Sequence, residues 1–137
     1  MPLGELICDY KGTITSVKIL PFDGAEFGVK YEVTQVGVST GKFASSAVGS
    51  NYVQVHEDGT STTKYYGVWT TEDGEPIMVE SGGMSVPLGG GRVRFATTVK
   101  CRSRAEKYEW LTSTPIGFEG EGDFNTMDVS GQLYLWD

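Results

Sequence analysis

Glu80, Tyr65 and Tyr52 are the residues whose types and spacing could support a reaction. Two Asp-Gly pairs, Asp58-Gly59 and Asp73-Gly74, lie between runs rich in β-branched and aromatic residues. Such pairs favour two-residue primed hairpin turns. With these turns, Tyr52 faces Tyr65 on neighbouring strands, and Glu80 lies diagonal to Tyr65 on the same face. A carboxylate buried among aromatic rings has a raised pKa and can act as an acid or a base, so the three residues are catalytic candidates.

The same register predicts which other side chains share this face, because side chains alternate along a strand. We expect Trp69, Met78, Gln54 and His56 there, as candidate ligand-binding residues. This mixture of aromatic and hydrogen-bonding groups suits a ligand cavity, an interface between copies of the chain, or an ordinary surface. The opposite face is expected to be plain core and carries Val53, Val55, Tyr66, Val68, Ile77 and Val79. The sequence does not establish which face points inward.

Metal and cofactor chemistry find little support in the sequence. His56 is the single histidine, the two cysteines Cys8 and Cys101 are far apart, and no ligand spacing is recognisable. The Gly82–Gly91 stretch lacks the Lys-Ser/Thr pair of a phosphate-binding loop. We therefore expect neither a metal nor a cofactor.

Charge and hydropathy exclude several classes of partner. The formal net charge is −7, and an acidic surface repels phosphate backbones, so we expect no nucleic-acid partner. No run approaches 18 consecutive apolar residues, and the N-terminus has no basic segment followed by an apolar one. The sequence thus predicts no membrane partner and a cytoplasmic location.

The pattern along the chain predicts an all-β fold. Glycine accounts for 19 of 137 residues, and no segment shows a sustained 3.6-residue apolar period. Residues 36–50 contain mostly small residues and are expected to be a long loop with at most one short strand. We expect a single domain over 1–137, an antiparallel β-barrel of about eight or nine strands. The predicted strands are 5–20, 27–35, 51–57, 60–71, 76–82, 91–101, 107–113, 115–124 and 129–136.

A series of short motifs over roughly 67–136 adds a resemblance to a known family. In order, they are Gly67-Val68-Trp69-Thr70-Thr71-Glu72-Asp73-Gly74-Glu75, Phe95-Ala96-Thr97-Thr98, Lys107-Tyr108-Glu109-Trp110-Leu111, Gly120-Glu121-Gly122-Asp123 and Leu133-Tyr134-Leu135-Trp136. This series resembles the DUF3237, or UPF0311, family of uncharacterised small barrel proteins. The allene-oxide-cyclase and dirigent barrels look similar in architecture. The resemblance implies an antiparallel barrel with an internal pocket and no settled chemistry.

Three functions remain open on the sequence alone. The leading expectation is a barrel that binds a small, partly apolar organic molecule. The second is a cofactor-independent isomerase or cyclase that acts through Glu80, Tyr65 and Tyr52. The third is a structural homo-oligomer whose mixed face is the interface.

Overall fold

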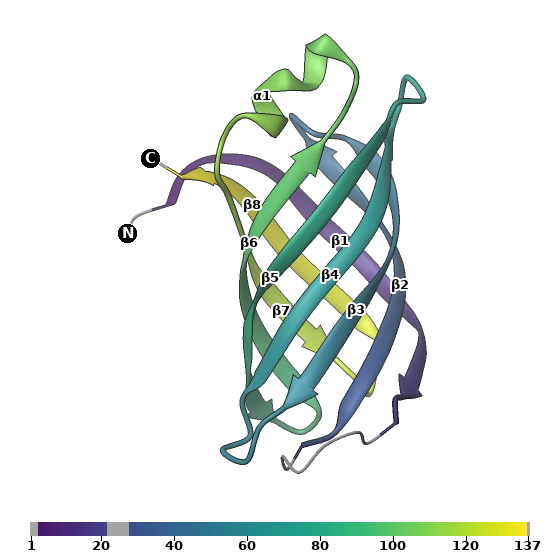
Figure 1. Ribbon diagram of the computed structural model, residues 1–137, viewed down its shortest axis with the longest axis vertical. Coiled ribbons are helices and arrows are strands. Elements are labelled where there is room, and N and C mark those ends of the chain that lie inside the picture. The colour runs from purple at the N-terminus through teal and green to yellow at the C-terminus, as the bar shows by residue number, and fades with distance from the viewer. Residues whose placement is uncertain (1–2, 22–27, 137) are drawn as a thin grey trace.

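Eight antiparallel strands close into a barrel in the computed structural model, which describes residues 3–21 and 28–136 (Figure 1). Each strand pairs with its neighbours in sequence, and the last strand pairs with the first, so the sheet has no free edge. The predicted all-β antiparallel barrel is confirmed. The strands are β1 (Leu3–Ile19), β2 (Lys30–Gly41), β3 (Ser45–Val55), β4 (Ser61–Thr71), β5 (Pro76–Gly89), β6 (Arg92–Arg102), β7 (Ile116–Asp123) and β8 (Asp128–Trp136).

Both Asp-Gly hairpins differ from the predicted primed turns. The His56 amide donates to the Thr60 carbonyl over 2.8 Å, and the Gly59 amide donates to the His56 carbonyl over 3.0 Å. Gly59 has a φ of +88°, whereas Asp58 is not among the residues of positive φ. This is a three-residue loop, a type I turn followed by a glycine bulge. The β4–β5 turn repeats it, with Gly74 also at +88°.

The longer loops shift the strand register by one residue relative to the prediction. Asn51, and not Tyr52, pairs with Tyr65, and Ile77, and not Met78, pairs with Trp69. A one-residue shift moves a whole strand's side chains to the other face. The predicted common face is therefore wrong: Tyr65 and Trp69 of β4 point into the barrel.

The small residues of 36–50 form strands, so the predicted loop is also wrong. β2 continues to Gly41 and β3 begins at Ser45. Aromatic rings from inside the barrel lie against this region: the Tyr10 ring covers Gly37 and the Tyr65 ring covers Gly49, where a Cβ atom would overlap the ring. Gly37 and Gly49 must be small because the Tyr10 and Tyr65 rings lie over them and occupy the space that a side chain would fill.

The segment predicted as a strand over 107–113 is instead a short helical cap. A 3-10 helix, η1 (Glu106–Tyr108), leads into α1 (Glu109–Thr112), which lies above one end of the barrel (Figure 1). Leu111 of α1 is fully buried. Asp73 of the β4–β5 turn accepts hydrogen bonds from Lys107 and Tyr108, which fixes the cap to the barrel. No helix in the described residues is long and apolar enough to cross a membrane.

The capped end is packed solidly with apolar side chains. They are Ile7, Cys8, Phe43, Trp69, Ile77, Cys101, Leu111, Ile116 and Leu133, each at most 3% exposed. Burial raises the pKa of both thiols, Cys8 and Cys101, to about 12, so neither forms a reactive thiolate near neutral pH. The open space inside the barrel lies toward its other end.

Candidate functional site: an internal cavity at one end of the barrel

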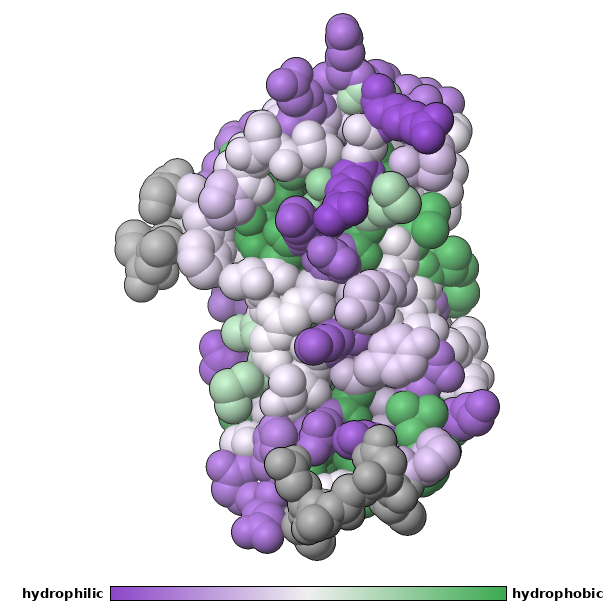
Figure 2. Space-filling model, viewed as in Figure 1, coloured by the Kyte–Doolittle hydropathy of each residue, from purple (hydrophilic) through white to green (hydrophobic). Residues whose placement is uncertain are grey.

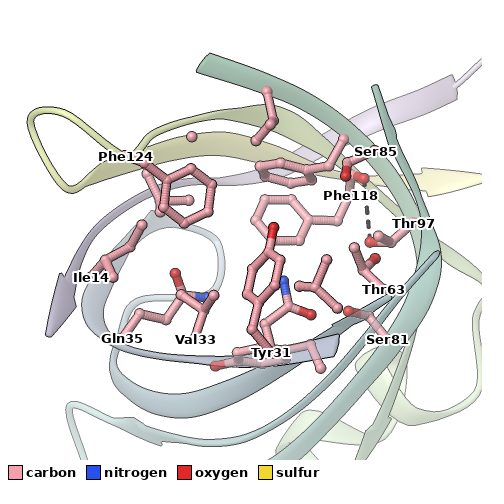
Figure 3. Close-up of a pocket in the computed structure, with 17 residues that line it drawn as sticks. Ile14, Tyr31, Val33, Gln35, Thr63, Ser81, Ser85, Thr97, Phe118 and Phe124 are labelled. Atoms are coloured by element: carbon pink, nitrogen blue, oxygen red, sulfur yellow. Dashed lines mark hydrogen bonds between the residues drawn. The ribbon is translucent and has the colours of Figure 1, made fainter. Parts of the chain in front are cut away.

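A cavity of about 80 Å³ lies inside the barrel, toward the end opposite the helical cap (Figure 3). All eight strands or the turns that join them contribute to its wall. Figure 3 shows the labelled side chains arranged around a common space within the ring of strands. The lining residues are Ile14, Tyr31, Val33, Gln35, Asn51, Val53, Thr63, Tyr65, Ser81, Ser85, Val93, Phe95, Thr97, Phe118, Gly122, Phe124 and Val129.

An aromatic cluster separates this cavity from the packed core. The Tyr10 ring stacks on Trp69 with ring centroids 5.1 Å apart, and Trp69 stacks on Phe43 at 5.5 Å. The Trp69 indole N–H donates to the Tyr65 hydroxyl over 3.0 Å. That bond satisfies the indole and fixes the Tyr65 ring between the cluster and the cavity. The inner end of the cavity is therefore rigid.

The outer end is bordered by two partly exposed rings. Tyr31 and Phe124 meet edge to face, with centroids 6.2 Å apart and an interplanar angle of 81°. Both rings are only half-buried, in contrast to the fully buried rings of the aromatic cluster.

Among the described residues, no charged side chain lines the cavity. Its ionisable groups are the phenols of Tyr31 and Tyr65, and burial raises the pKa of both above the ordinary tyrosine value. Both are therefore neutral at physiological pH. The described part of the wall offers hydrogen bonds and apolar contacts.

Several polar groups in the wall have free hydrogen-bonding capacity. The Asn51 Oδ1 atom is buried and has no hydrogen-bond partner in the described residues. Gln35, Thr63 and Ser81 also make no side-chain hydrogen bond to the described part of the chain, whereas Thr97 donates to the Phe118 carbonyl over 3.4 Å. The side-chain polar groups of Gln35, Thr63 and Ser81 are therefore available to water or a ligand.

The predicted site residues do not come together in the structure. Of the seven, only Tyr65 lines the cavity, and Trp69 lies behind it in the core. On the outside, Glu80 is exposed between Tyr66 and Lys100, its partners in the adjoining strands. The others are also away from the cavity: Tyr52, Gln54 and Met78 lie on the outer face, and His56 lies at the β3–β4 turn.

The residues that sequence reasoning missed are the neutral polar ones, chiefly Asn51, Thr63 and Ser81. They alternate with exposed residues along β3, β4 and β5, so the period-two pattern was present. A three-residue reading of both Asp-Gly loops would have placed Asn51 opposite Tyr65 and Tyr65 opposite Ser81, as observed.

The outer face of the barrel carries its own apolar feature, an outer row of four side chains. Val36, Val48, Val68 and Met78 are consecutive partners across β2–β5, and each is 40–55% exposed. Figure 2 shows apolar side chains reaching the surface on this side of the barrel. Apolar side chains aligned across four strands are unusual on a free surface.

Metal ligation finds no geometric support in the part of the chain that the structure describes. Those residues contain no group of three or more His, Cys, Asp or Glu side chains placed to hold an ion. The sequence prediction of a protein without a bound metal stays a prediction.

Comparison with known proteins identifies the fold of this chain but not its function. No family model matches the chain, and no curated protein does. Solved structures do match. A protein of unknown function from Clostridium acetobutylicum superposes with a TM-score of 0.83 at 16% identity, over 96% of each chain. One from Rhodopseudomonas palustris gives 0.80 at 15% identity, over 98% of this chain and 99% of that one.

Two further structures extend the comparison. A β-barrel-like protein from Acinetobacter baumannii has a TM-score of 0.79 and 16% identity, over 98% of this chain and 96% of that one. An enzyme from Penicillium herquei is more distant, at 0.65 and 18% identity, with coverage of 98% and 96%. At these identities the likeness shows a shared small β-barrel fold.

Proposed function

We propose that this protein binds a small, partly apolar organic molecule in the internal cavity. The observation that carries the proposal is the composition of the wall, in which aromatic and aliphatic side chains surround a few neutral polar groups with unused hydrogen bonds. Ligand sites commonly combine an apolar lining with a few polar groups that fix orientation. The closed barrel holds these groups in place before the ligand arrives, which lowers the entropic cost of binding.

The volume of the cavity limits the size of the ligand. Drug-sized molecules occupy pockets of about 300–1,000 Å³, and a cavity of about 150 Å³ holds benzene. The 80 Å³ here suits a molecule of one small ring at most, and a six-membered ring requires outward rotation of Tyr31 or Phe124. We therefore expect the ligand to be no larger than a single substituted ring.

The lining favours binding over the alternative of a cofactor-independent isomerase or cyclase. Such an enzyme needs a group that accepts a proton near neutral pH. Glu80, the predicted acid or base, lies outside the barrel, and the two cavity tyrosines have raised pKa values and are poor bases. The catalytic reading of Glu80, Tyr65 and Tyr52 stays a prediction.

Filling the cavity tests the proposal. Ser81→Phe places a ring inside the barrel and is expected to weaken binding of one-ring compounds at least about tenfold, as measured by ligand-observed NMR, because the ring occupies their volume. Met84→Phe, on the exposed outer face of the same strand, is the matched control and should leave binding unchanged. Unaltered binding in a folded Ser81→Phe variant would place the ligand elsewhere.

We also propose that two copies of the chain associate through the outer row, Val36, Val48, Val68 and Met78. Its exposed apolar side chains support this, because a two-fold contact would bury the same row from both copies. Val48→Glu is then expected to shift the protein from dimer to monomer in sedimentation velocity at a fixed concentration. A wild-type protein that stays monomeric up to high concentration would contradict the proposal.

We infer in addition that the motifs of 67–136 reflect membership of the DUF3237 family. The small barrels of unknown function that superpose on this chain support the inference at the level of the fold.

A further inference from the structure

The outer row contains one side chain that can be chemically modified. Three of its members, Val36, Val48 and Val68, are aliphatic, whereas the fourth, Met78, carries a thioether sulfur. Met78 is 55% exposed in the barrel. Exposed methionine is readily oxidised to methionine sulfoxide, and aliphatic side chains do not undergo this reaction. The row therefore combines an apolar surface with a single oxidisable atom.

The same strand supplies a methionine of similar exposure outside the outer row. Met84 is 53% exposed and lies on the outer face of β5, six residues beyond Met78. At the usual rise of a strand, the two are about 20 Å apart. Met84 pairs with Thr62 and Ala96, and neither belongs to the outer row. Met127 packs against the core, so Met78 and Met84 are the two exposed methionines of the described residues.

Oxidation converts the end of the outer row from apolar to polar. Hydrogen peroxide transfers one oxygen atom to the sulfur of Met78: the S–O bond forms as the O–O bond breaks, the sulfur loses two electrons, and the peroxide leaves as water. The sulfoxide oxygen accepts hydrogen bonds. Arg102 pairs with Met78 across β5–β6, is exposed, and forms no ion pair within the described part of the chain. Its guanidinium is thus a donor adjacent to the sulfoxide.

A two-fold contact contains this change twice. When the outer row of one copy covers the outer row of the other, both copies place Met78 in the contact. Each sulfoxide then loses hydration on association, and the apolar contact of each thioether is lost as well. Oxidation therefore weakens association by two such costs for every pair of copies.

We propose that Met78 is an oxidation site and that its sulfoxide separates the two copies of the chain. This inference rests on the proposed association through the outer row and names what regulates it: a peroxide releases the single chains, and reduction of the sulfoxide restores the contact. Peroxide reacts with the separate chains, because association covers Met78. The coupling is reciprocal, so association also protects Met78 from oxidation.

Sedimentation velocity of the full-length protein before and after treatment with hydrogen peroxide tests the switch. Oxidation of the wild-type protein is expected to raise the dissociation constant of the pair at least about tenfold. Met78→Leu keeps an apolar side chain without sulfur and should remain associated after the same treatment. Met84→Leu is the matched control and should respond as the wild type does. Met78→Gln, which is polar, should weaken association without any peroxide.

The rate of oxidation at each position provides an independent measurement. Mass spectrometry of peptides quantifies the sulfoxide at Met78 and at Met84 in the same sample. At low protein concentration the two residues should oxidise at similar rates, since their exposures are similar. At a concentration where pairs prevail, Met78 should oxidise several-fold more slowly than Met84.

The outcomes separate this inference from the association on which it rests. If the untreated protein is a monomer at every concentration, the proposed association fails, and the switch fails with it. If the untreated protein associates but full oxidation of Met78 leaves the dissociation constant unchanged, the switch is wrong while association stands. The same conclusion follows if Met78→Leu dissociates on oxidation as the wild type does, or if Met78 and Met84 oxidise equally fast in the associated protein.

Discussion

Replacing Gly49 with alanine is expected to destabilise the barrel by about 2–4 kcal/mol, the sum of an overpacking cost and a lost hydrogen bond. The added methyl group would overlap the hydroxyl end of Tyr65, whose ring lies across Gly49 and Gly67. The ring is 7% exposed, and moving it toward the cavity would break the hydrogen bond that its hydroxyl accepts from the Trp69 N–H. A denaturant titration measures the loss as a lower unfolding midpoint.

Two comparisons assign this effect to the ring. Gly82→Ala, also within a strand, places a methyl group in ordinary contact with the Thr63 carbonyl oxygen, 3.6 Å away, and should change stability little. Combining Gly49→Ala with Tyr65→Ala removes the obstacle, so the alanine at 49 should cost much less in that background. Equal costs in both backgrounds would mean that the strand itself, and not the ring, requires glycine.

Trp69→Ala is expected to cost about 3–5 kcal/mol, the usual range for removing a buried tryptophan. Its ring is 1% exposed, stacks between Tyr10 and Phe43, and donates to Tyr65. The substitution leaves a void beside the cavity and frees the Tyr65 hydroxyl. Since domain stability is typically about 5–15 kcal/mol, this single change should bring the barrel near its limit of stability.

The neighbouring residue supplies the control for Trp69. Thr70 lies on the outer face of the same strand, is exposed and is not part of the outer row, so Thr70→Ala should shift the unfolding free energy by about 0.5 kcal/mol or less. Similar losses for the two variants would show that the aromatic cluster contributes no more than an outer position does.

The sequence predicted the fold well because strand alternation and turn residues are local properties. Both Asp-Gly hairpins and an antiparallel barrel of about eight or nine strands followed from them, and the structure closes with eight. The strands through Gly37 and Gly49 were missed because their residues are mostly small. These small residues are required by the Tyr10 and Tyr65 rings, each of which lies over its glycine from an adjoining strand. Such complementarity between strands becomes visible only once the register is known.

The site was predicted less well, and one structural detail accounts for the difference. An Asp-Gly pair is compatible with a two-residue primed turn and with a three-residue loop ending in a glycine bulge, and the two differ by one residue in register. With the observed three-residue loops, Tyr52, Met78 and Glu80 lie on the outer surface and not in the predicted site. These loops also bring Asn51 and Ser81 into the interior.

The pairing of the first strand with the last has a consequence for how the chain is made. Seven of the eight strand pairs join neighbours in sequence, so they can form as hairpins while synthesis proceeds. The remaining pair joins Cys8 to Leu133 and Asp9 to Gln132, residues separated by almost the whole chain. Until β8 leaves the ribosome, β1 exposes an unpaired edge to other nascent chains, and the ligand cavity has no complete wall. The internal cavity can therefore form only once β8 has been synthesised and has paired with β1.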